Sequence, residues 1–134
     1  MIRVFLDANI LFSAAFREAS GLMLLWSKKG VHLVTSSYAL REAERNITLK
    51  RPIASDRLRV LISQVEVTNV LNPMDNDYGL PPKDQPILAA ALASGCAALL
   101  TGDIADFGHL MGQSIQGTQV MTVSMFLTGY PDIE

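Results

Sequence analysis

The chain has 134 residues, of which 49% are hydrophobic and 18% are charged. This length and composition predict one globular domain over residues 1–134. The apolar stretches, such as residues 2–6 and 87–92, fall well short of the ~20 residues that cross a bilayer, and the start of the chain lacks the features of a signal peptide. The single cysteine, Cys96, excludes an internal disulfide and is typical of a buried thiol in a reducing compartment. We therefore expect a cytoplasmic protein without a membrane segment.

Charge is distributed unevenly along the chain, although the net charge is only −2. Residues 1–59 contain ten Lys/Arg against five Asp/Glu, whereas residues 60–134 contain one Lys against eight Asp/Glu. Such an asymmetry can separate an anion-binding side from a cation-binding side. It is also compatible with ordinary solvated helix faces, so charge alone does not decide between the two.

Strand and helix patterns alternate along the chain. In order, the first half predicts a strand at residues 3–6, helices at 10–19 and 22–29, a strand at 31–35, a helix capped by Ser36 or Ser37, a helix at 56–65 and a strand at 66–70. The second half predicts a loop at residues 71–82, a helix at 83–94, a strand at 97–101, a short helix at 105–111, a strand at 119–123 and a final short helix capped by Ser124. This alternation predicts an α/β fold whose parallel sheet is covered on both faces.

Acidic side chains occur where the predicted strands end. Asp7 ends the first strand, and Asp103 follows the fourth, with Asp106 one helical step further on. Asp84 starts the helix that leads into the fourth strand, and Glu42 lies nearly two turns into the helix after the second strand. Because open α/β sheets bind ligands beyond the carboxyl ends of their strands, we expect these carboxylates to meet at one edge.

Several carboxylates at one edge cannot all be ionised without a compensating charge, because each raises the pKa of its neighbours. A hard divalent cation such as Mg²⁺ supplies that charge and adds substrate phosphate oxygens to its ligands. It also activates water and stabilises the charge that develops during phosphodiester hydrolysis. A single aspartate after a strand is often only a turn or cap residue, so the interpretation depends on the acidic set as a whole.

Four segments, in their order and spacing, resemble the PIN domain nucleases. They are FLDANIL at residues 5–11, SYALRE at 37–42, KDQPILAAA at 83–91 and LTGDIADF at 100–107. The resemblance implies a three-layer α/β/α PIN-like fold with a central parallel β-sheet. It also implies a ribonuclease site that depends on Mg²⁺ or Mn²⁺.

The resemblance also assigns roles to individual residues. The acidic quartet corresponds to Asp7, Glu42, Asp84 and Asp103. We expect the ion to be held by Asp7, Asp84, Asp103 and an additional acidic position, Asp106. Asn9 and Thr101 match polar positions beside the first and third acidic motifs, where they can orient a ligand. Glu44 is a rival for Glu42, but it lies about 200° further round the helix, and the apolar stripe of Leu40, Ala43 and Ile47 favours Glu42.

For function, the resemblance implies an RNA substrate cleaved to 5′-phosphate and 3′-hydroxyl products. Stand-alone PIN domains of this size are commonly the toxin half of a toxin–antitoxin pair and are often dimers, so it also implies an antitoxin partner and a homodimer. The alternative is a non-catalytic PIN-like module that binds RNA or protein, against which the intact acidic set argues. The basic residues that we favour for contact with a nucleic-acid backbone are Lys28, Lys29, Arg41, Arg45, Lys50 and Arg51.

Other chemistries fit the sequence less well. A metal-free ribonuclease would pair His32 with His109, but nothing in the sequence brings the two together. A haloacid-dehalogenase-like phosphatase would need an aspartate at position 9, where this chain has Asn9. A receiver domain would need an aspartate at the end of a middle strand, but the second strand ends in residues 34–37, Val-Thr-Ser-Ser.

Overall fold

The structure is a computed structural model that describes residues 1–17, 21–69 and 73–130. Over these ranges the chain forms a six-stranded sheet with the strand order β3-β2-β1-β4-β6-β5. The strands are β1 (Ile2–Leu6), β2 (Val31–Ser36), β3 (Glu66–Thr68), β4 (Ala98–Leu100), β5 (Ser114–Ile115) and β6 (Thr118–Met121). All neighbouring strands of this sheet run parallel except the β5–β6 pair, so the predicted parallel sheet is confirmed for its central part.

The strand order reverses beside β1. From β1 the chain moves outward to β2 and then β3, crosses back to β4 on the other side of β1, and continues to β6. A right-handed crossover places its helix on one face when the chain moves one way across the sheet and on the other face when it moves back. The carboxyl ends of β1 and β4 therefore form the reversal point at which open α/β sheets bind ligands.

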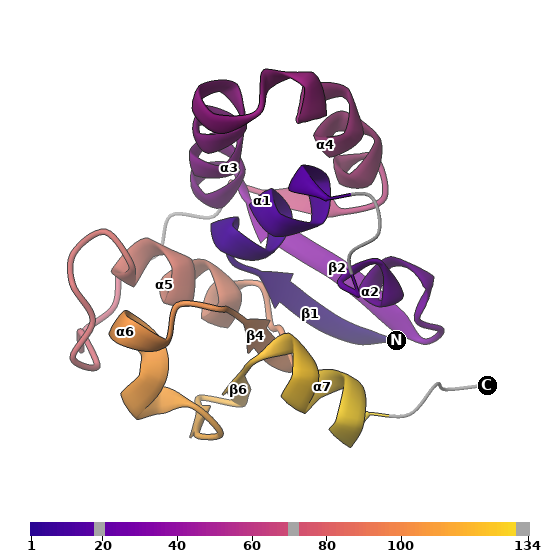
Figure 1. The fold of residues 1–134 in the computed structure, drawn as a ribbon. Coiled ribbons are helices and arrows are strands. Elements are labelled where there is room, and N and C mark those ends of the chain that lie inside the picture. Colours follow the sequence, from indigo (N-terminus) through magenta and orange to yellow (C-terminus); the bar gives the residue numbers. More distant parts are fainter. Residues whose placement is uncertain (18–20, 70–72, 131–134) are drawn as a thin grey trace.

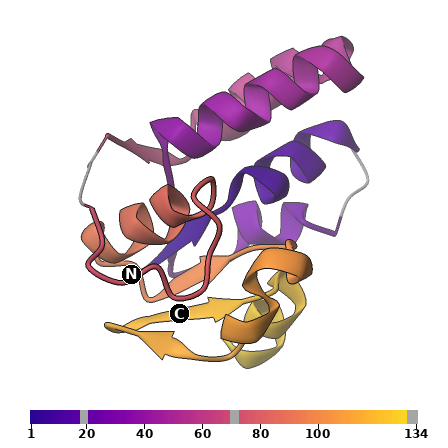
Figure 2. The same ribbon diagram turned by 90° about the vertical axis from the view of Figure 1, so that its left-hand side faces the viewer.

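Helices cover both faces of the sheet, which confirms the expected three-layer α/β/α arrangement. The helices are α1 (Ala8–Phe16), α2 (Met23–Ser27), α3 (Ser37–Lys50), α4 (Ser55–Ile62), α5 (Gln85–Ala93), α6 (Ile104–Phe107) and α7 (Val123–Gly129). Short 3-10 helices occur at η1 (Pro52–Ala54) and η2 (Gly108–Leu110). Figure 1 shows α1, α3 and α4 grouped above β1 and β2, with α5 and α6 at the lower left, and Figure 2 shows the same grouping from the side.

The central strands are buried along their whole carboxyl halves. Val4, Phe5 and Leu6 of β1 are fully buried in succession, as are all three residues of β4. An unbroken buried run is what a strand needs when helices cover both of its faces. None of the helices in the described ranges is long and apolar enough to cross a bilayer.

Several predicted boundaries change. The predicted cap Ser124 is wrong: β6 ends at Met121, and Thr122 caps α7 by accepting a hydrogen bond from the Met125 N–H.

Strand β5 was not predicted, because two residues carry no recognisable periodicity. It pairs with β6 across a tight turn in which Gln116 and Gly117 both have positive φ. The predicted helix at residues 105–111 is instead α6 followed by η2. Residues 18–19 of a predicted helix, residue 70 of a predicted strand and residues 71–72 of a predicted loop lie outside the described residues.

Three strands are joined on one side of the sheet by Glu66, at the start of β3. Arg3 of β1 donates both terminal guanidinium N–H groups to its carboxylate, at 3.1 and 3.0 Å, and His32 Nε2 of β2 lies 2.9 Å from it. Arg3 Nε also donates to the Ser94 carbonyl, at 2.9 Å. The hydrogen bonds from Arg3, and then from His32, lower the pKa of Glu66 to about 2.

Replacing Glu66 by Gln should lower the free energy of unfolding by roughly 0.5 kcal/mol at neutral pH, because the ion pair is partly exposed. Folding lowers the pKa of this carboxyl from 4.5 to about 2, so its contribution is present in full above pH 4.5 and is lost as the pH falls toward 2. Urea unfolding of both proteins across this pH range measures the difference.

The matched control is Asp56→Asn, which removes an exposed ion pair with Arg59 on α4 and should have a smaller effect. A stability difference between wild type and Glu66→Gln that does not shrink below pH 4.5 would contradict the assignment.

Candidate active site

The site begins with Asp7, which directly follows β1 and caps α1. Its side chain is 4% exposed, and the Ala8 N–H donates to its Oδ1 at 2.6 Å. The Thr101 hydroxyl donates to its Oδ2 at 2.7 Å, and the Asn9 amide nitrogen lies 3.3 Å from the same oxygen. The carboxylate is therefore held in one orientation by two residues at the start of α1 and by the residue that follows β4.

Thr101 connects Asp7 to Asp103. While its hydroxyl donates to Asp7, it accepts a hydrogen bond from the Asp103 backbone N–H, at 3.1 Å. Asn9 strengthens the connection, because its side-chain oxygen accepts from the Gly102 N–H at 3.0 Å. Asn9 and Thr101, which we expect to orient a ligand, both contact Asp7, and together they fix the loop after β4 against the end of β1.

Burial and charge act together on Asp7. The pKa of its carboxyl is raised, chiefly because burial disfavours the charged form, and the negative charges of Glu42 and Asp103 add to the increase. The hydrogen bonds from Thr101 and Ala8 oppose it. A carboxylate that is buried next to other carboxylates favours the approach of a cation.

A cluster of three more aspartates lies beside Asp7. Asp84, Asp103 and Asp106 each place one carboxylate oxygen within 4.8 Å of the others. Asp103 caps α6 by accepting from the Asp106 N–H at 3.1 Å, whereas the buried side chain of Asp84 makes no capping bond to α5. The structure therefore brings together three carboxylates that are separated by up to 22 positions in the sequence.

Lys83 neutralises part of this charge, and the sequence did not single it out. Its ammonium nitrogen lies 2.7 Å from Asp106 Oδ2, 3.0 Å from Asp84 Oδ2 and 3.8 Å from Asp103 Oδ2. These contacts raise the pKa of Lys83, and the hydrogen bond from Lys83 lowers that of Asp106. Burial, followed by the hydrogen bond with Asp106, raises the pKa of Asp84 to about 6.

Tyr38, near the start of α3, is a further residue that the sequence did not reveal. Its hydroxyl donates to the Lys83 carbonyl oxygen at 2.7 Å, and so ties α3 to the segment that carries Lys83 and Asp84. Burial raises the pKa of Tyr38, and the charges of Glu42 and Asp84 raise it further. The only signal in the sequence was its place in the motif SYALRE, which does not reveal this contact.

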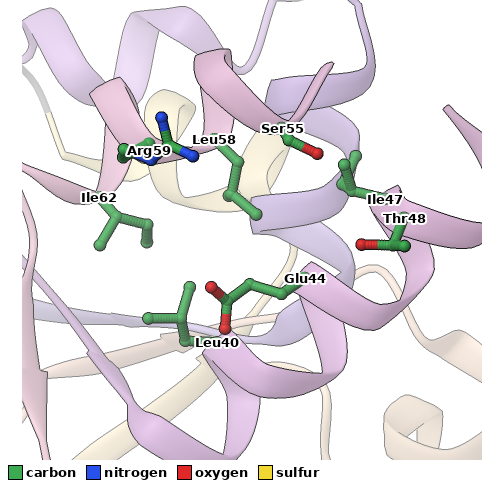
Figure 3. Close-up of a pocket in the computed structure, with 8 residues that line it drawn as sticks. All are labelled: Leu40, Glu44, Ile47, Thr48, Ser55, Leu58, Arg59 and Ile62. Atoms are coloured by element: carbon green, nitrogen blue, oxygen red, sulfur yellow. The ribbon is translucent and has the colours of Figure 1, made fainter. Parts of the chain in front are cut away.

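Glu42 and Glu44 face different surfaces. Glu42 lines a groove together with Asp7, Asn9 and Lys50. Glu44 instead lies in the groove between α3 and α4, with Leu58 on the opposite wall (Figure 3). The structure thus brings Glu42 into the groove beside Asp7 and places Glu44 in a different one.

The predicted basic residues divide between the two edges of the sheet. Lys50 lines the groove beside Asp7, and Arg51 follows it at the end of α3. Arg41 lines a separate hollow between α3 and α5, and Arg45 is exposed on α3. Lys28 and Lys29 precede β2, so they lie at the opposite edge of the sheet from the carboxylates.

The two histidines do not form a pair. His32, on β2, contacts Glu66 at the start of the neighbouring strand β3. His109 Nε2 instead lies 2.7 Å from the Tyr78 carbonyl oxygen, in the loop before α5. The acidic residues, not the histidines, are therefore the groups that the fold gathers.

Solved structures of known proteins share this fold. VapBC2 from Rickettsia felis, bound to a DNA fragment from its promoter, has a TM-score of 0.65 and 17% identity, over 90% of this chain and 98% of that one. VapBC-1 from nontypeable Haemophilus influenzae has a TM-score of 0.61 and 16% identity, over 90% and 98%. VapC20 from Mycobacterium tuberculosis, a sarcin–ricin loop cleaving toxin, has a TM-score of 0.58 and 16% identity, over 76% and 92%. At sequence identities this low, the structural likeness shows a common fold and nothing further.

The family comparison extends the likeness to the sequence itself. No curated protein matches the chain. The profile of the PIN domain, however, matches residues 3–105, which include Asp7, Glu42, Asp84 and Asp103. The chain therefore belongs to the PIN domain family.

Proposed function

We propose that this chain is a ribonuclease that depends on Mg²⁺ or Mn²⁺ and hydrolyses RNA phosphodiester bonds. The observation that carries the proposal is the meeting of Asp84, Asp103 and Asp106 within 4.8 Å, beside the buried Asp7. Membership of the PIN domain family and the likeness to VapC20, a sarcin–ricin loop cleaving toxin, support it.

The chemistry of the side chains fits a divalent ion. Carboxylate oxygens are the ligands that Mg²⁺ and Mn²⁺ prefer. The cluster already attracts a cation, since the Lys83 ammonium lies among all three of its carboxylates. Asp84, Asp103 and Asp106 would hold the ion, and Asp7 would add its charge and the lone pairs that its hydrogen bonds leave unused.

When bound, a divalent ion supplies an activated water and stabilises negative charge at the scissile phosphate. The chain's own residues position the carboxylates and accept the proton that water loses. Thr101 and Asn9 hold the Asp7 carboxylate in place, and Glu42, on the same groove, offers a carboxylate oxygen that can accept the proton of the attacking water. Water forms the new bond to phosphorus, and the bond from phosphorus to the 3′ oxygen breaks. The 3′ oxygen takes up a proton from solvent, so the products carry a 5′-phosphate and a 3′-hydroxyl.

We also propose that the protein is the toxin of a toxin–antitoxin pair and forms a homodimer. The likeness to VapC20 and to VapBC complexes from three other bacteria supports the toxin role. The homodimer follows from the family resemblance and is tested by light scattering of the purified chain.

Asp7→Asn and Asp103→Asn should each lower the rate of RNA cleavage by at least about a hundredfold, because each removes a charge from the site that holds the ion. EDTA should abolish cleavage by the wild type, and Mn²⁺ should restore it. Denaturing gels of end-labelled RNA measure the rates and identify the new ends.

The matched control compares two glutamates on the same helix. Glu42→Gln should slow cleavage strongly, whereas Glu44→Gln, in the groove between α3 and α4, should leave the rate close to that of the wild type. Cleavage that survives both EDTA and the aspartate variants would rule out the metal mechanism. Binding of varied RNAs without cleavage by any protein would favour a non-catalytic module.

Lys83→Met should tighten Mn²⁺ binding by roughly tenfold, because the ammonium competes with the ion for the same carboxylates. A unit charge 4 Å from another contributes about 1 kcal/mol even at the dielectric constant of water, and an ion of charge +2 doubles this. About 2 kcal/mol corresponds to roughly thirtyfold, which screening by salt reduces to roughly tenfold. Titration of Mn²⁺ followed by electron paramagnetic resonance measures the affinity without reference to activity.

The same variant should melt at a lower temperature than the wild type in EDTA, and added Mn²⁺ should reduce that difference. Lys83→Arg, which keeps the charge, and Lys29→Met, which removes a charge at the opposite edge, are the controls and should bind Mn²⁺ much as the wild type does. Unchanged or weaker Mn²⁺ binding by Lys83→Met would show that Lys83 does not compete with the ion.

A further inference from the structure

Two phenylalanines and two cations lie side by side along α1 and the end of α3. Phe12 and Phe16, one turn apart on α1, have ring centroids 5.2 Å apart and planes tilted by 37°. Lys50 Nζ lies 5.4 Å from the centre of the Phe12 ring, and Arg51 Cζ lies 5.2 Å from that of Phe16. We call these four residues, Phe12, Phe16, Lys50 and Arg51, the aromatic strip.

The aromatic strip is continuous with the acidic site. Phe12 and Lys50 line the same groove as Asp7 and Glu42, with Asn46 beside them. Phe16 continues from Phe12 in the direction away from Asp7. A ligand that reaches the carboxylates along this groove therefore passes the rings and the cations in turn.

All four side chains are open to solvent to some degree. Lys50 and Arg51 are exposed, and both phenylalanines are half-buried, so neither is enclosed in the core. Interactions of this kind between a cation and a ring contribute only about 0.5–1 kcal/mol at exposed sites. A nucleobase stacked on an aromatic side chain contributes about 1–3 kcal/mol, enough to displace the cation from the ring. The displaced Lys or Arg is then free to bind the adjacent phosphate.

We propose that the aromatic strip binds an unpaired stretch of RNA, with bases stacked on Phe12 and Phe16 and phosphates held by Lys50 and Arg51. The strand then continues along the groove to Asp7 and Glu42. This proposal rests on the proposed ribonuclease function and assigns the residues that guide an unpaired strand to the carboxylates. Bases inside a duplex already stack on their neighbours, so their faces cannot reach the two rings, and a paired RNA should bind less tightly.

The test is fluorescence anisotropy of a short labelled single-stranded RNA and of the same sequence as a duplex, in EDTA so that cleavage does not interfere. Wild type should bind the single strand more tightly. Phe12→Leu/Phe16→Leu keeps apolar side chains of similar volume but removes the aromatic faces, and should weaken single-strand binding by at least about tenfold. Its dependence on salt should not change.

Lys50→Gln/Arg51→Gln changes only exposed side chains, and should act differently. It should weaken binding and reduce the slope of log affinity against log salt concentration by about 1.4, since each phosphate contact on a single strand contributes about 0.7. The control Arg59→Gln removes an exposed charge on α4, outside the proposed RNA path, and should leave both affinity and slope nearly unchanged. Thermal melting of each variant shows whether it is folded.

Two results would overturn the proposal: a folded Phe12→Leu/Phe16→Leu that binds single-stranded RNA as the wild type does, or equal affinity for single strand and duplex. Cleavage assays in Mn²⁺ distinguish failure of this binding proposal from failure of the ribonuclease proposal. A wild type that never cleaves RNA but binds it through the aromatic strip contradicts only the ribonuclease proposal.

Discussion

Mutual repulsion between acidic side chains is the constraint that shapes this edge of the sheet. Asp7, Asp84, Asp103 and Asp106 crowd together, and a folded chain keeps them there only if other groups offset the repulsion. Part of the compensation comes from helix N-termini, because Asp7 caps α1 and Asp103 caps α6. The remainder comes from the Thr101 hydroxyl and the Lys83 ammonium.

These contacts show that a helix cap and a candidate metal ligand are not exclusive roles. The Asp7 carboxylate accepts the Ala8 N–H through one oxygen and the Thr101 hydroxyl through the other. Capping fixes the direction of the side chain, and a fixed direction is what a ligand to a divalent ion requires. The site is thus prepared by the same hydrogen bonds that begin the helix.

Topology explains why residues distant in sequence meet here. Among the strands of the described residues, only β1 has as neighbours two strands that the chain reaches by moving in opposite directions. The ends of β1 and β4 therefore lie open between two sets of helices. Asp7 leaves β1 and Asp103 follows β4, while α5 starts at the same edge and brings Asp84 with it. The proposed RNA path uses the remaining approach, between α1 and α3.

Strands and carboxylates could be predicted because both depend on local patterns: unbroken apolar runs, and acidic residues where those runs end. The choice of Glu42 over Glu44 followed from helical geometry in the same way, and the two side chains do lie in different grooves. Lys83 and Tyr38 were missed because their roles depend on contacts between α3 and the segment before α5. The basic half of the sequence does not form one surface, since residues that precede a strand and residues that follow it lie at opposite edges.

We propose that these carboxylates meet in order to hold a divalent ion. A crystal soaked in Mn²⁺ and measured for anomalous scattering is the decisive test. We expect a strong peak bound by oxygens of Asp84, Asp103 and Asp106, on the side that faces Asp7, with the Lys83 ammonium moved away. Clear density for the four side chains with no ion among them, at a Mn²⁺ concentration that saturates the protein in solution, would contradict it.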